Sequence, residues 1–439
     1  MDYKLDSHRL RKNVRSTSDT HTHATPIRIC ILGGGFGGLY TALYLQRFCS
    51  SRLKNSQITL VDRKDHLVFT PLLYELVTDE LQAWEIGPSF KKLLKHTTIQ
   101  FCQGIVQGVD LETRQIKVKR EDVVEQNPDL LTYDYLVLAV GAEMRLDGIP
   151  GAATYAYSFR TVADAERLKA RLRELENSDR QTIQVAVVGG GPSGVELACK
   201  VADRLGRRGQ VRLIERGTEL LKTFSRYSRV AAYRALKARH VQIDFETSIE
   251  AVEADQIIVV NKDGTTNLPV DLVLWTVGTR SIDWVRNLPC RQNSQGQLII
   301  LPTLQVVDYP EVFALGDLAE IEYPRRKNVP ATAQAAYQQA DCAAHNIARA
   351  IGGKPLKAFH YLHLGEMLTL GKGAAVVSSF ALKIEGRLAS IIRQFVYLQR
   401  LPTLPHRLQV LKHWIRQWLA SFWQQLTKFS FGRRRRRKG

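Results

Sequence analysis

A glycine-rich turn between two short apolar runs constrains this chain more than any other stretch. The runs, residues 28–32 and 58–61, predict buried parallel strands, and residues 39–48 between them predict a helix. Asp62 closes the second strand. This order of strand, glycine turn, helix, strand and acid is the fingerprint of a dinucleotide-binding unit. The turn has the G-x-G-x-x-G spacing and carries the residues expected at the ligand: Gly33, Gly35, Phe36, Gly37 and Gly38.

Each spaced glycine of this turn has a distinct physical task. Gly33 permits the tight turn, Gly35 lets the backbone approach a pyrophosphate, and Gly38 lets the helix pack on the strand. The free N–H groups at the start of the helix favour phosphate oxygens. Asp62 is expected to accept a hydrogen bond from a ribose hydroxyl. A glycine turn that serves packing alone is the alternative.

The same pattern occurs a second time. Residues 184–188 and 211–214 predict strands around a second glycine turn, and a predicted helix runs on from Val195. Glu215 closes the second strand about 20 residues after the last glycine of the turn, as the fingerprint requires. Two intact fingerprints imply two dinucleotides, one held and one exchanged. The spaced glycines of the second turn are Gly189, Gly191 and Gly194.

Three later strands end in glycine and complete the two units. Residues 135–140 and 272–277 are apolar runs that mirror each other in the first and second unit. Residues 312–315 predict a strand with which the chain re-enters the first unit, and an aspartate follows it. The residues that these strands deliver are Gly141, Gly278, Gly316 and Asp317.

Charge and cysteine usage restrict the class of protein. The formal net charge of +19 indicates an anionic partner, either a membrane surface, a nucleic acid or a charged substrate. The six cysteines are scattered, so the sequence predicts neither a disulfide framework nor a metal site. Residues 1–26 are polar and lack the apolar core of a secretory signal. We therefore expect a disordered N-terminal tail and a protein on the cytoplasmic side of a membrane.

The C-terminal segment indicates that the anionic partner is a membrane surface. Residues 386–439 hold 13 basic residues and no acidic one, and apolar positions from residue 408 onward define one helical face. Such a basic amphipathic helix is typical of a membrane interface, and no apolar run approaches the ~18 residues of a spanning helix. A helix packed on the protein's own core is the alternative, whereas no nucleic-acid fold accompanies the basic run. The apolar face comprises Leu408, Leu411, Ile415, Trp418, Leu419, Phe422, Leu426 and Phe429.

These motifs occur in the order seen in two-dinucleotide flavoproteins. Residues 330–351 predict a helix with proline in its first turn. Within it, residues 333–339 resemble the quinone-side helix of type II NADH dehydrogenases. Four further stretches resemble the cyanobacterial and plastid branch of that family, which reduces demethylphylloquinone. The resemblance extends from residue 27 to the C-terminus. The four stretches are residues 69–77, most of which lie in a predicted loop rich in apolar and aromatic residues (66–76), and residues 84–86, 272–279 and 364–368.

The resemblance implies an FAD-dependent enzyme that passes a hydride from NAD(P)H to flavin and two electrons to a membrane quinone, without proton pumping. It places FAD on the first fingerprint, with its ribityl-phosphate side at Asp317, and NAD(P)H on the second. A demethylnaphthoquinone of phylloquinone biosynthesis is the implied quinone; plastoquinone or ubiquinone in a respiratory-type enzyme is the alternative. Glu215 would favour NADH by repelling the 2′-phosphate of NADPH, whereas Arg216 could pair with that phosphate.

The resemblance also supplies catalytic candidates. Glu196, just after the second turn, would relay protons or order the nicotinamide, or it simply compensates the helix dipole. Gln334, Tyr337 and Gln338 are three or four residues apart, so one helical face would present them together to quinone carbonyls. They could instead satisfy one another at a domain seam. The basic C-terminal segment predicts an anionic lipid surface as a further partner, and the sequence leaves a homodimer open.

The expected fold class is α/β, with two Rossmann-like dinucleotide-binding domains and a C-terminal amphipathic helical segment that binds a membrane. In sequence order the predicted parts are the tail (1–26), a discontinuous FAD-binding domain (27–150 and 278–352), an NAD(P)H-binding domain (151–277), a quinone- and membrane-side region (353–404), and the amphipathic helix with its basic tail (405–439).

Three other functions share this fold. A disulfide oxidoreductase needs a cysteine pair near the flavin, and Cys49 at the end of the first helix has no close partner in sequence. A sulfide:quinone oxidoreductase needs flavin-side cysteines and no working nicotinamide turn, whereas the second fingerprint and Glu215 are intact. A flavin-binding redox sensor would bind FAD with negligible turnover, and only an assay separates it from an enzyme.

Overall fold

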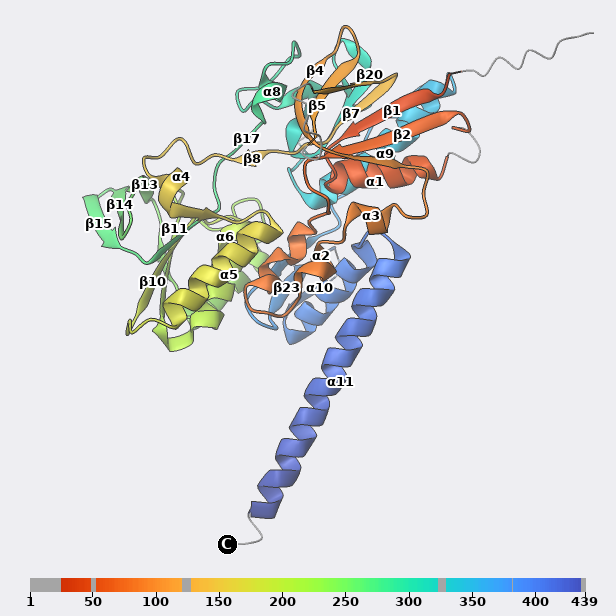
Figure 1. Cartoon of the computed structure of the whole chain (residues 1–439). Coiled ribbons are helices and arrows are strands. Elements are labelled where there is room, and N and C mark those ends of the chain that lie inside the picture. Colours follow the sequence, from red (N-terminus) through yellow and green to blue (C-terminus); the bar gives the residue numbers. More distant parts are fainter. Residues whose placement is uncertain (1–24, 49–52, 121–127, 323–328, 381, 436–439) are drawn as a thin grey trace, which may run out of the picture.

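The chain folds into two sheet-bearing parts and a C-terminal region from which a long helix projects (Figure 1). The computed structural model describes residues 25–48, 53–120, 128–322, 329–380 and 382–435, and side chains as far as residue 419. The expected N-terminal tail therefore lies almost entirely outside the described residues. The α/β class with Rossmann-like sheets is confirmed.

The first part is an eight-stranded sheet whose central strands run parallel. Its strand order, β21-β18-β19-β20-β7-β1-β2-β3, brings together segments from both ends of the chain. The helices α1 (Phe36–Gln46) and α9 (Ala333–Ile351) pack against each other beside it (Figure 1). The strands are β1 (Ile27–Leu32), β2 (Ser56–Asp62), β3 (Gln100–Gln103), β7 (Tyr135–Leu138), β18 (Leu298–Ile300), β19 (Gln305–Val306), β20 (Tyr309–Ala314) and β21 (Ala319–Ile321).

The register of this sheet assembles the first site. Leu32 of β1 pairs with Val61 of β2 and with Leu138 of β7, and Leu138 pairs with Ala314 of β20. These four strands therefore end at one edge. The glycine turn, Asp62, Gly141 and the 316–317 loop all follow that edge, where ligands of open parallel sheets bind.

The second part is a five-stranded parallel sheet in the order β12-β11-β10-β16-β9. Helices α5 (Val162–Glu176), α6 (Pro192–Leu205) and α7 (Arg226–Ala238) flank it. Val188 pairs with both Ile214 and Trp275, so the second glycine turn, Glu215 and residues 276–278 also share one edge. The strands are β9 (Ala156–Ser158), β10 (Ile183–Val188), β11 (Gly209–Ile214), β12 (Gln242–Asp244) and β16 (Leu272–Trp275).

Smaller elements connect and extend these sheets. Two antiparallel three-stranded sheets and one two-stranded ribbon are described, together with short helices. They are β4 (Ile105–Asp110), β5 (Gln115–Lys119) and β6 (Asp129–Thr132); β13 (Ser248–Val252), β14 (Gln256–Asn261) and β15 (Gly264–Pro269); β8 (Glu143–Met144) with β17 (Thr279–Arg280); α2 (Ala83–Ile86), α3 (Phe90–Leu93), α4 (Ala152–Tyr155) and α8 (Asp283–Arg286); and the 3-10 helices η1 (Thr70–Leu76), η2 (Gly206–Arg208) and η3 (Gly316–Leu318).

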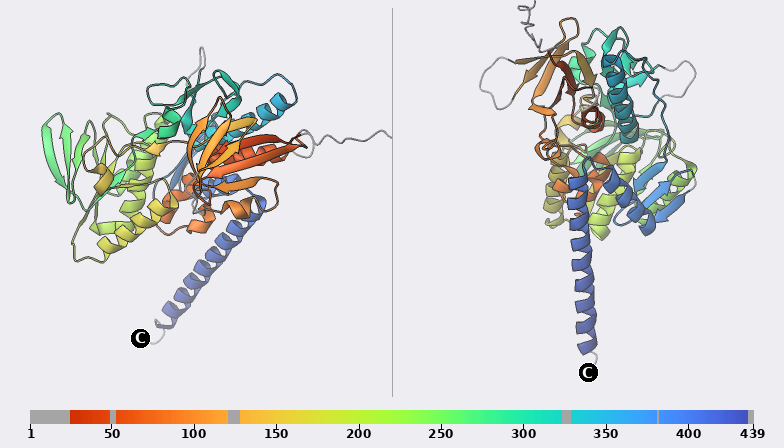
Figure 2. Two further views of the ribbon diagram at one scale, coloured as in Figure 1. Left: turned by 45° about the horizontal axis from the view of Figure 1, so that its top comes forward. Right: turned by 90° about the vertical axis from the view of Figure 1, so that its right-hand side faces the viewer.

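The C-terminal region consists of the antiparallel sheet β22 (Glu366–Thr369), β23 (Ala375–Ser378) and β24 (Lys383–Gly386), followed by α10 (Arg387–Arg400) and α11 (Leu404–Arg435). One apolar core runs from η1 through α6 into this region, including Leu398, Leu401 and Val410. Beyond its first turns α11 leaves the body, and both views in Figure 2 show it pointing away. Within the described residues, no helix has the length and apolarity to span a bilayer.

Three boundaries differ from the sequence-based expectation for physical reasons. Helix α1 begins at Phe36 because the last glycines of the turn already adopt helical geometry. Residues 70–76, expected as a loop, form the 3-10 helix η1 with proline in its first turn. Helix α9 begins after Thr332, whose hydroxyl accepts a hydrogen bond from Ala335 N at 3.2 Å, and not at Pro330.

Candidate active site

The first glycine turn has the backbone geometry that its sequence predicts. Gly33 has φ +97°, and a Cβ on it would lie 2.4 Å from Ala139 O. A Cβ on Gly38 would lie 1.8 Å from Gly33 O, so helix and strand pack there without any side chain. A Cβ on Gly35 meets nothing within 4 Å, because this residue faces open space. The turn therefore combines a tight bend, a close packing contact and an open backbone surface.

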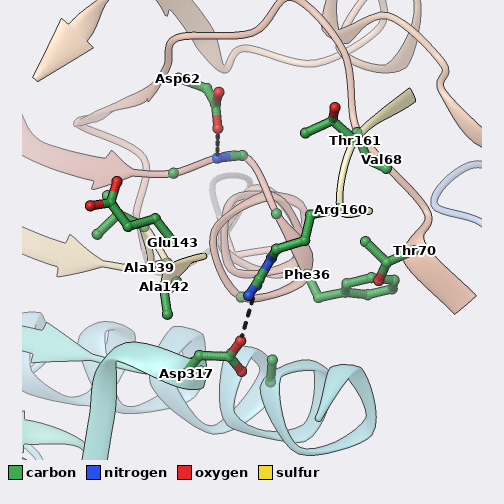
Figure 3. A pocket seen from close by; sticks show the side chains of 18 of the residues that line it. Phe36, Asp62, Val68, Thr70, Ala139, Ala142, Glu143, Arg160, Thr161 and Asp317 are labelled. Atoms are coloured by element: carbon green, nitrogen blue, oxygen red, sulfur yellow. Dashed lines mark hydrogen bonds and ion pairs between the residues drawn. The ribbon is translucent and has the colours of Figure 1, made fainter. Parts of the chain in front are cut away.

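That open surface is part of a cleft of about 470 Å³ along the edge of the eight-stranded sheet. Figure 3 shows Phe36 on one wall, Asp62 beside the turn, and Arg160 reaching across towards Asp317. Gly141 also lines the cleft, and a Cβ on it would meet nothing within 4 Å. The cleft thus joins the ends of four strands with the start of α9.

Asp62 and Glu215 stabilise their glycine turns in the same way. Asp62 Oδ2 accepts a hydrogen bond from Gly34 N at 2.5 Å, and its Oδ1 accepts one from Lys64 N at 2.8 Å. Glu215 Oε2 accepts from Gly190 N at 2.6 Å and Oε1 accepts from Gly217 N at 2.6 Å. A carboxylate has about four lone-pair sites, so each acid keeps capacity for a further donor.

The second glycine turn repeats the geometry of the first. Gly189 has φ +111°, and a Cβ on Gly194 would lie 1.8 Å from Gly189 O. Gly191, like Gly35, has nothing within 4 Å of an added Cβ. Gly278 has φ +74° at the end of the neighbouring strand β16. The two units are therefore matched in backbone conformation as well as in sequence.

Asp317 stands at the far end of the cleft from Asp62. Its Oδ2 lies 3.6 Å from a guanidinium nitrogen of Arg160, two residues after the end of β9. The preceding Gly316 has φ +78° and donates its N–H to Gln339 Oε1 at 2.8 Å. Buried Gln339 therefore fixes the loop that carries Asp317, while Arg160 places a cation over the cleft.

Glu196 lies outside the lining of this cleft, in the second turn of α6, and is buried. Its Oε1 accepts a hydrogen bond from Thr369 N of β22 at 2.8 Å and lies 3.6 Å from an Arg393 nitrogen. Burial is the largest influence on this carboxyl and raises the pKa of Glu196 to about 7, against the opposing effect of Arg393. Glu196 therefore belongs to the junction between α6 and the C-terminal region.

Three more charged groups of that junction are linked to Glu196 through Arg393. An Arg393 nitrogen lies 2.5 Å from Glu75 Oε1, and Lys200 Nζ lies 3.9 Å from the same oxygen. Lys200 also pairs with Glu80. Three carboxyl groups and two cations thus meet where η1, α6 and α10 come together. Such a set is electrically balanced when one of the three carboxyls holds a proton.

The three α9 candidates are divided by the structure. Gln334 and Gln338 bind the backbone of residues 361–365, with Gln338 Nε2 donating to Leu362 O at 2.8 Å. Tyr337 instead turns towards α1, where its ring centroid lies 4.8 Å from that of Tyr40. None of the three lines the cleft described above.

Comparison with known proteins places the chain in a family. Residues 27–340 match the pyridine nucleotide-disulphide oxidoreductase family. The chain belongs to this family. The pair of cofactors expected from the sequence, a flavin and NAD(P)H, is that of flavin-dependent NAD(P)H enzymes of the family.

Several members of the family resemble the chain over nearly its whole length. Demethylphylloquinone reductase of Synechocystis sp. is 43% identical over 90% of this chain and 96% of its own length. The chloroplastic/mitochondrial alternative NAD(P)H-ubiquinone oxidoreductase C1 of Arabidopsis thaliana is 38% identical over 88% of this chain and 80% of its own. The structure of NDH2 from Plasmodium falciparum in complex with NADH superposes with TM-score 0.77 at 20% identity, covering 89% of this chain and 98% of that one, which shows the shared fold.

The cleft fits the flavin dinucleotide of this family. Gly35 leaves free the space that a Cβ would fill, and the start of α1 directs backbone N–H groups into it. No cysteine occurs among the described residues that line the cleft, so a redox-active disulfide beside a flavin has no residue there. Sequence reasoning missed Arg160 and Gln339. The position of Arg160, two residues after a strand and just before the Thr161 cap of α5, was the available signal.

Proposed function

We propose that the chain is an NAD(P)H:quinone oxidoreductase that carries FAD and reduces a membrane quinone of the demethylnaphthoquinone class. The observation that carries this proposal is the pair of matched glycine turns, each closed by its own acid. The 43% identity to a demethylphylloquinone reductase supports the choice of quinone. Bound flavin supplies the chemistry, accepting a hydride from NAD(P)H and passing two electrons to the quinone.

The first turn would hold the pyrophosphate of FAD, with Asp62 at the adenosine ribose and Asp317 at the ribityl-phosphate side. Arg160, 3.6 Å from Asp317, supplies positive charge over the same cleft. The second turn would hold the pyrophosphate of NAD(P)H, with Glu215 at the adenine ribose. By this assignment the chain's own residues bind and orient both cofactors at the carboxyl ends of two parallel sheets.

Glu196 would hold and release a proton for quinone reduction. A quinone takes up two electrons and two protons to become a quinol, and NAD(P)H provides a hydride, so one proton must come from solution. A carboxyl whose burial raises its pKa to about 7 exchanges its proton near neutral pH. Its hydrogen bond from Thr369 N ties it to β22 of the C-terminal region, which is the proposed quinone side.

The proposed place of action is the surface of a bilayer, on its cytoplasmic side. Exposed apolar side chains follow one face of α11, including Leu404, Leu408, Leu411, Ile415 and Trp418. The continuation of this face at Phe422, Leu426 and Phe429 lies outside the described side chains. Nearby basic residues attract anionic lipid by about 1 kcal/mol each. Peripheral binding, the domain boundaries given above and a homodimer remain predictions.

A stopped-flow experiment tests the function. The purified protein is mixed with NADH or NADPH while flavin absorbance is followed, and quinones of different ring substitution are then added. Fast bleaching and quinone-dependent return of the flavin spectrum are expected. Bleaching without return in any quinone would reduce the chain to a flavin-binding sensor.

A respiratory-type enzyme is the second candidate. The 38% identity to an NAD(P)H-ubiquinone oxidoreductase favours it. Faster reoxidation of the reduced flavin by ubiquinone or plastoquinone analogues than by naphthoquinones would decide for this candidate.

A further inference from the structure

One face of α9 binds the chain that runs back along the helix. Asn346 Nδ2 donates to Lys357 O at 2.8 Å, and Asn346 Oδ1 accepts from Lys357 N at 2.9 Å. Two turns earlier, Gln338 forms the same pair of hydrogen bonds with Leu362. Its Nε2 donates to Leu362 O at 2.8 Å, and its Oε1 accepts from Leu362 N at 2.9 Å. Each side-chain amide therefore pairs with both the N–H and the C=O of one residue, as the backbone of a neighbouring strand would.

Gln334 continues this series one turn further towards the start of α9. Its Oε1 accepts from Leu364 N at 3.0 Å and from the Tyr361 hydroxyl at 2.8 Å. Its Nε2 donates to Gly365 O at 3.4 Å, the longest of these contacts. We call residues 361–365 the strap. The polar ends of both glutamines are thus occupied by strap atoms.

The two ends of the bound segment differ in burial. Asn346 is fully buried, and Phe359 beside its partner Lys357 is 3% exposed. On the strap itself, Leu362 is 56% exposed and Leu364 is 39% exposed. The segment is therefore packed into the core at one end, whereas the strap is held mainly by the two glutamines.

The strap also lies beside further exposed apolar side chains. Glu366 pairs with Ser378 at the end of the β22–β23 ladder, and a Cβ on Gly365 would lie 2.8 Å from Ser379 Cβ. Leu364 and Phe380, which is 83% exposed, consequently flank the same strand ends. Leu388, Ile391 and Phe395 add an exposed apolar stripe on the adjoining helix α10.

We propose that the strap is a lipid-contacting gate over the two glutamines. Leu362, Leu364 and Phe380 insert into a bilayer, and the strap backbone then separates from Gln334 and Gln338. The glutamine Nε2 groups, which now donate to strap carbonyls, become donors for a quinone carbonyl of the same chemistry. The long Gln334–Gly365 contact opens first. The binding of a quinone by the two glutamines rests on the proposed function, whereas the response of the strap to lipid does not.

Charge argues for lipid as the occupant over a second copy of the chain. The residues that follow this hairpin, 386–439, hold 13 basic and no acidic residues. A second copy docked there would bring like charges together, whereas anionic headgroups would neutralise them. Exposed apolar side chains followed by a basic segment fit the interface of such a bilayer.

Hydrogen exchange of the intact, FAD-loaded protein tests the gate. With anionic phospholipid vesicles, the amides of Leu362 and Leu364 should exchange about tenfold faster or more, which corresponds to about 1.4 kcal/mol. The Lys357 amide, held by Asn346, should not change. Unchanged or slower exchange at the strap on vesicles that carry the bound protein overturns the proposal. Loss of protection that depends on protein concentration without lipid also overturns it, in favour of a second copy.

A variant pair gives a second readout. Leu362→Ser combined with Leu364→Ser should abolish the vesicle effect on strap exchange and raise the KM for a long-tailed quinone in vesicles about tenfold. Leu130→Ser on β6, at a leucine that is 57% exposed, is the matched control and should change neither value. An unaltered vesicle effect in the double variant contradicts the gate. Absence of any quinone reduction in the wild type contradicts the proposed function instead and leaves the exchange result standing.

Discussion

Oε1 of Glu196 on α6 lies 3.6 Å from a guanidinium nitrogen of Arg393 on α10, although nearly half of the chain separates the two residues in sequence. The same guanidinium reaches Glu75 at 2.5 Å and donates to Pro71 O at 2.5 Å. Arg393 therefore joins the C-terminal region to both cofactor-binding parts. Because it is 2% exposed, it also cannot belong to the lipid-facing charge of the segment that contains it.

Replacing Arg393 should destabilise the protein strongly. Arg393→Met removes the cation beside buried Glu196 and leaves buried Glu75 with only Lys200, at 3.9 Å. Removing one partner of a buried ion pair costs about 3–5 kcal/mol. Urea unfolding measures this loss. Arg387→Met on the same helix, where the side chain is exposed, is the matched control and should stay within about 0.5 kcal/mol. Equal stability of the two variants would show that the Arg393 contacts contribute nothing.

The stability of the protein should depend on pH through the buried carboxyl of Glu196. The pKa of Glu196 is raised by burial to about 7, whereas a free glutamate has a pKa of about 4.3. Between these values the folded chain binds a proton that the unfolded chain has released, so stability falls as pH rises. The wild type should lose up to about 3 kcal/mol relative to Glu196→Gln from about pH 5 to 8, measured by urea unfolding. Parallel curves for the two proteins would exclude this titration.

Flavin binding at the first glycine turn can be tested by the colour of the purified protein. Gly35→Val places a branched side chain in the open space above the turn, so the protein should purify without flavin. Asp317→Ala should weaken flavin retention by removing the acid at the far end of the cleft. Gly108→Val on β4, where an added Cβ also meets nothing within 4 Å, should remain yellow. A yellow Gly35→Val protein would place the flavin elsewhere.

The choice between NADH and NADPH should depend on Glu215. Its carboxylate is fixed by Gly190 N and Gly217 N, which directs it to the edge of the second turn. Glu215→Gln removes the repulsion of a 2′-phosphate and should raise the NADPH/NADH ratio of kcat/KM about tenfold. Glu219→Gln, at an exposed acid paired with Arg229, is the control. A ratio that stays the same in Glu215→Gln means that this acid does not face the ribose.

Much of this architecture could be predicted because its determinants are local in sequence. The backbone roles of Gly33, Gly35 and Gly38 follow from sterics. The structure shows the tight bend at Gly33, the close packing contact at Gly38 and open space beside Gly35. Parallel pairing then brings Asp62, Gly141 and Asp317 to one edge without further information.

The junction and the strap could not be predicted, since both depend on contacts between distant segments. Glu75 and Arg393 are 318 residues apart in sequence, and no periodicity connects them. Gln334, Tyr337 and Gln338 share a spacing that puts them near one helical face, yet the neighbours of α9 divide them between the strap and α1. Spacing fixes direction on a helix, but only packing decides what each direction meets.

The last prediction concerns α11, and the structure decides where to cut it. Val410 is buried, His406 Nε2 lies 2.9 Å from Glu85 O, and Trp414 Nε1 donates to Glu85 Oε1 at 2.7 Å. These contacts attach the helix base to α2. Deleting residues 405–439 therefore exposes part of the core, whereas deleting residues 418–439 removes only the part that projects from the body.

The shorter deletion should release the enzyme from membranes without lowering its stability. It removes five of the eight residues of the predicted apolar face together with the basic run, so the protein should stay in the supernatant when anionic liposomes are sedimented. Reduction of water-soluble quinones should persist, while reduction of long-tailed quinones in liposomes should be lost. High salt should release the full-length protein only partly, because salt screens the charge attraction but not the apolar contact. Continued sedimentation of the 418–439 deletion would assign membrane binding to residues before 418.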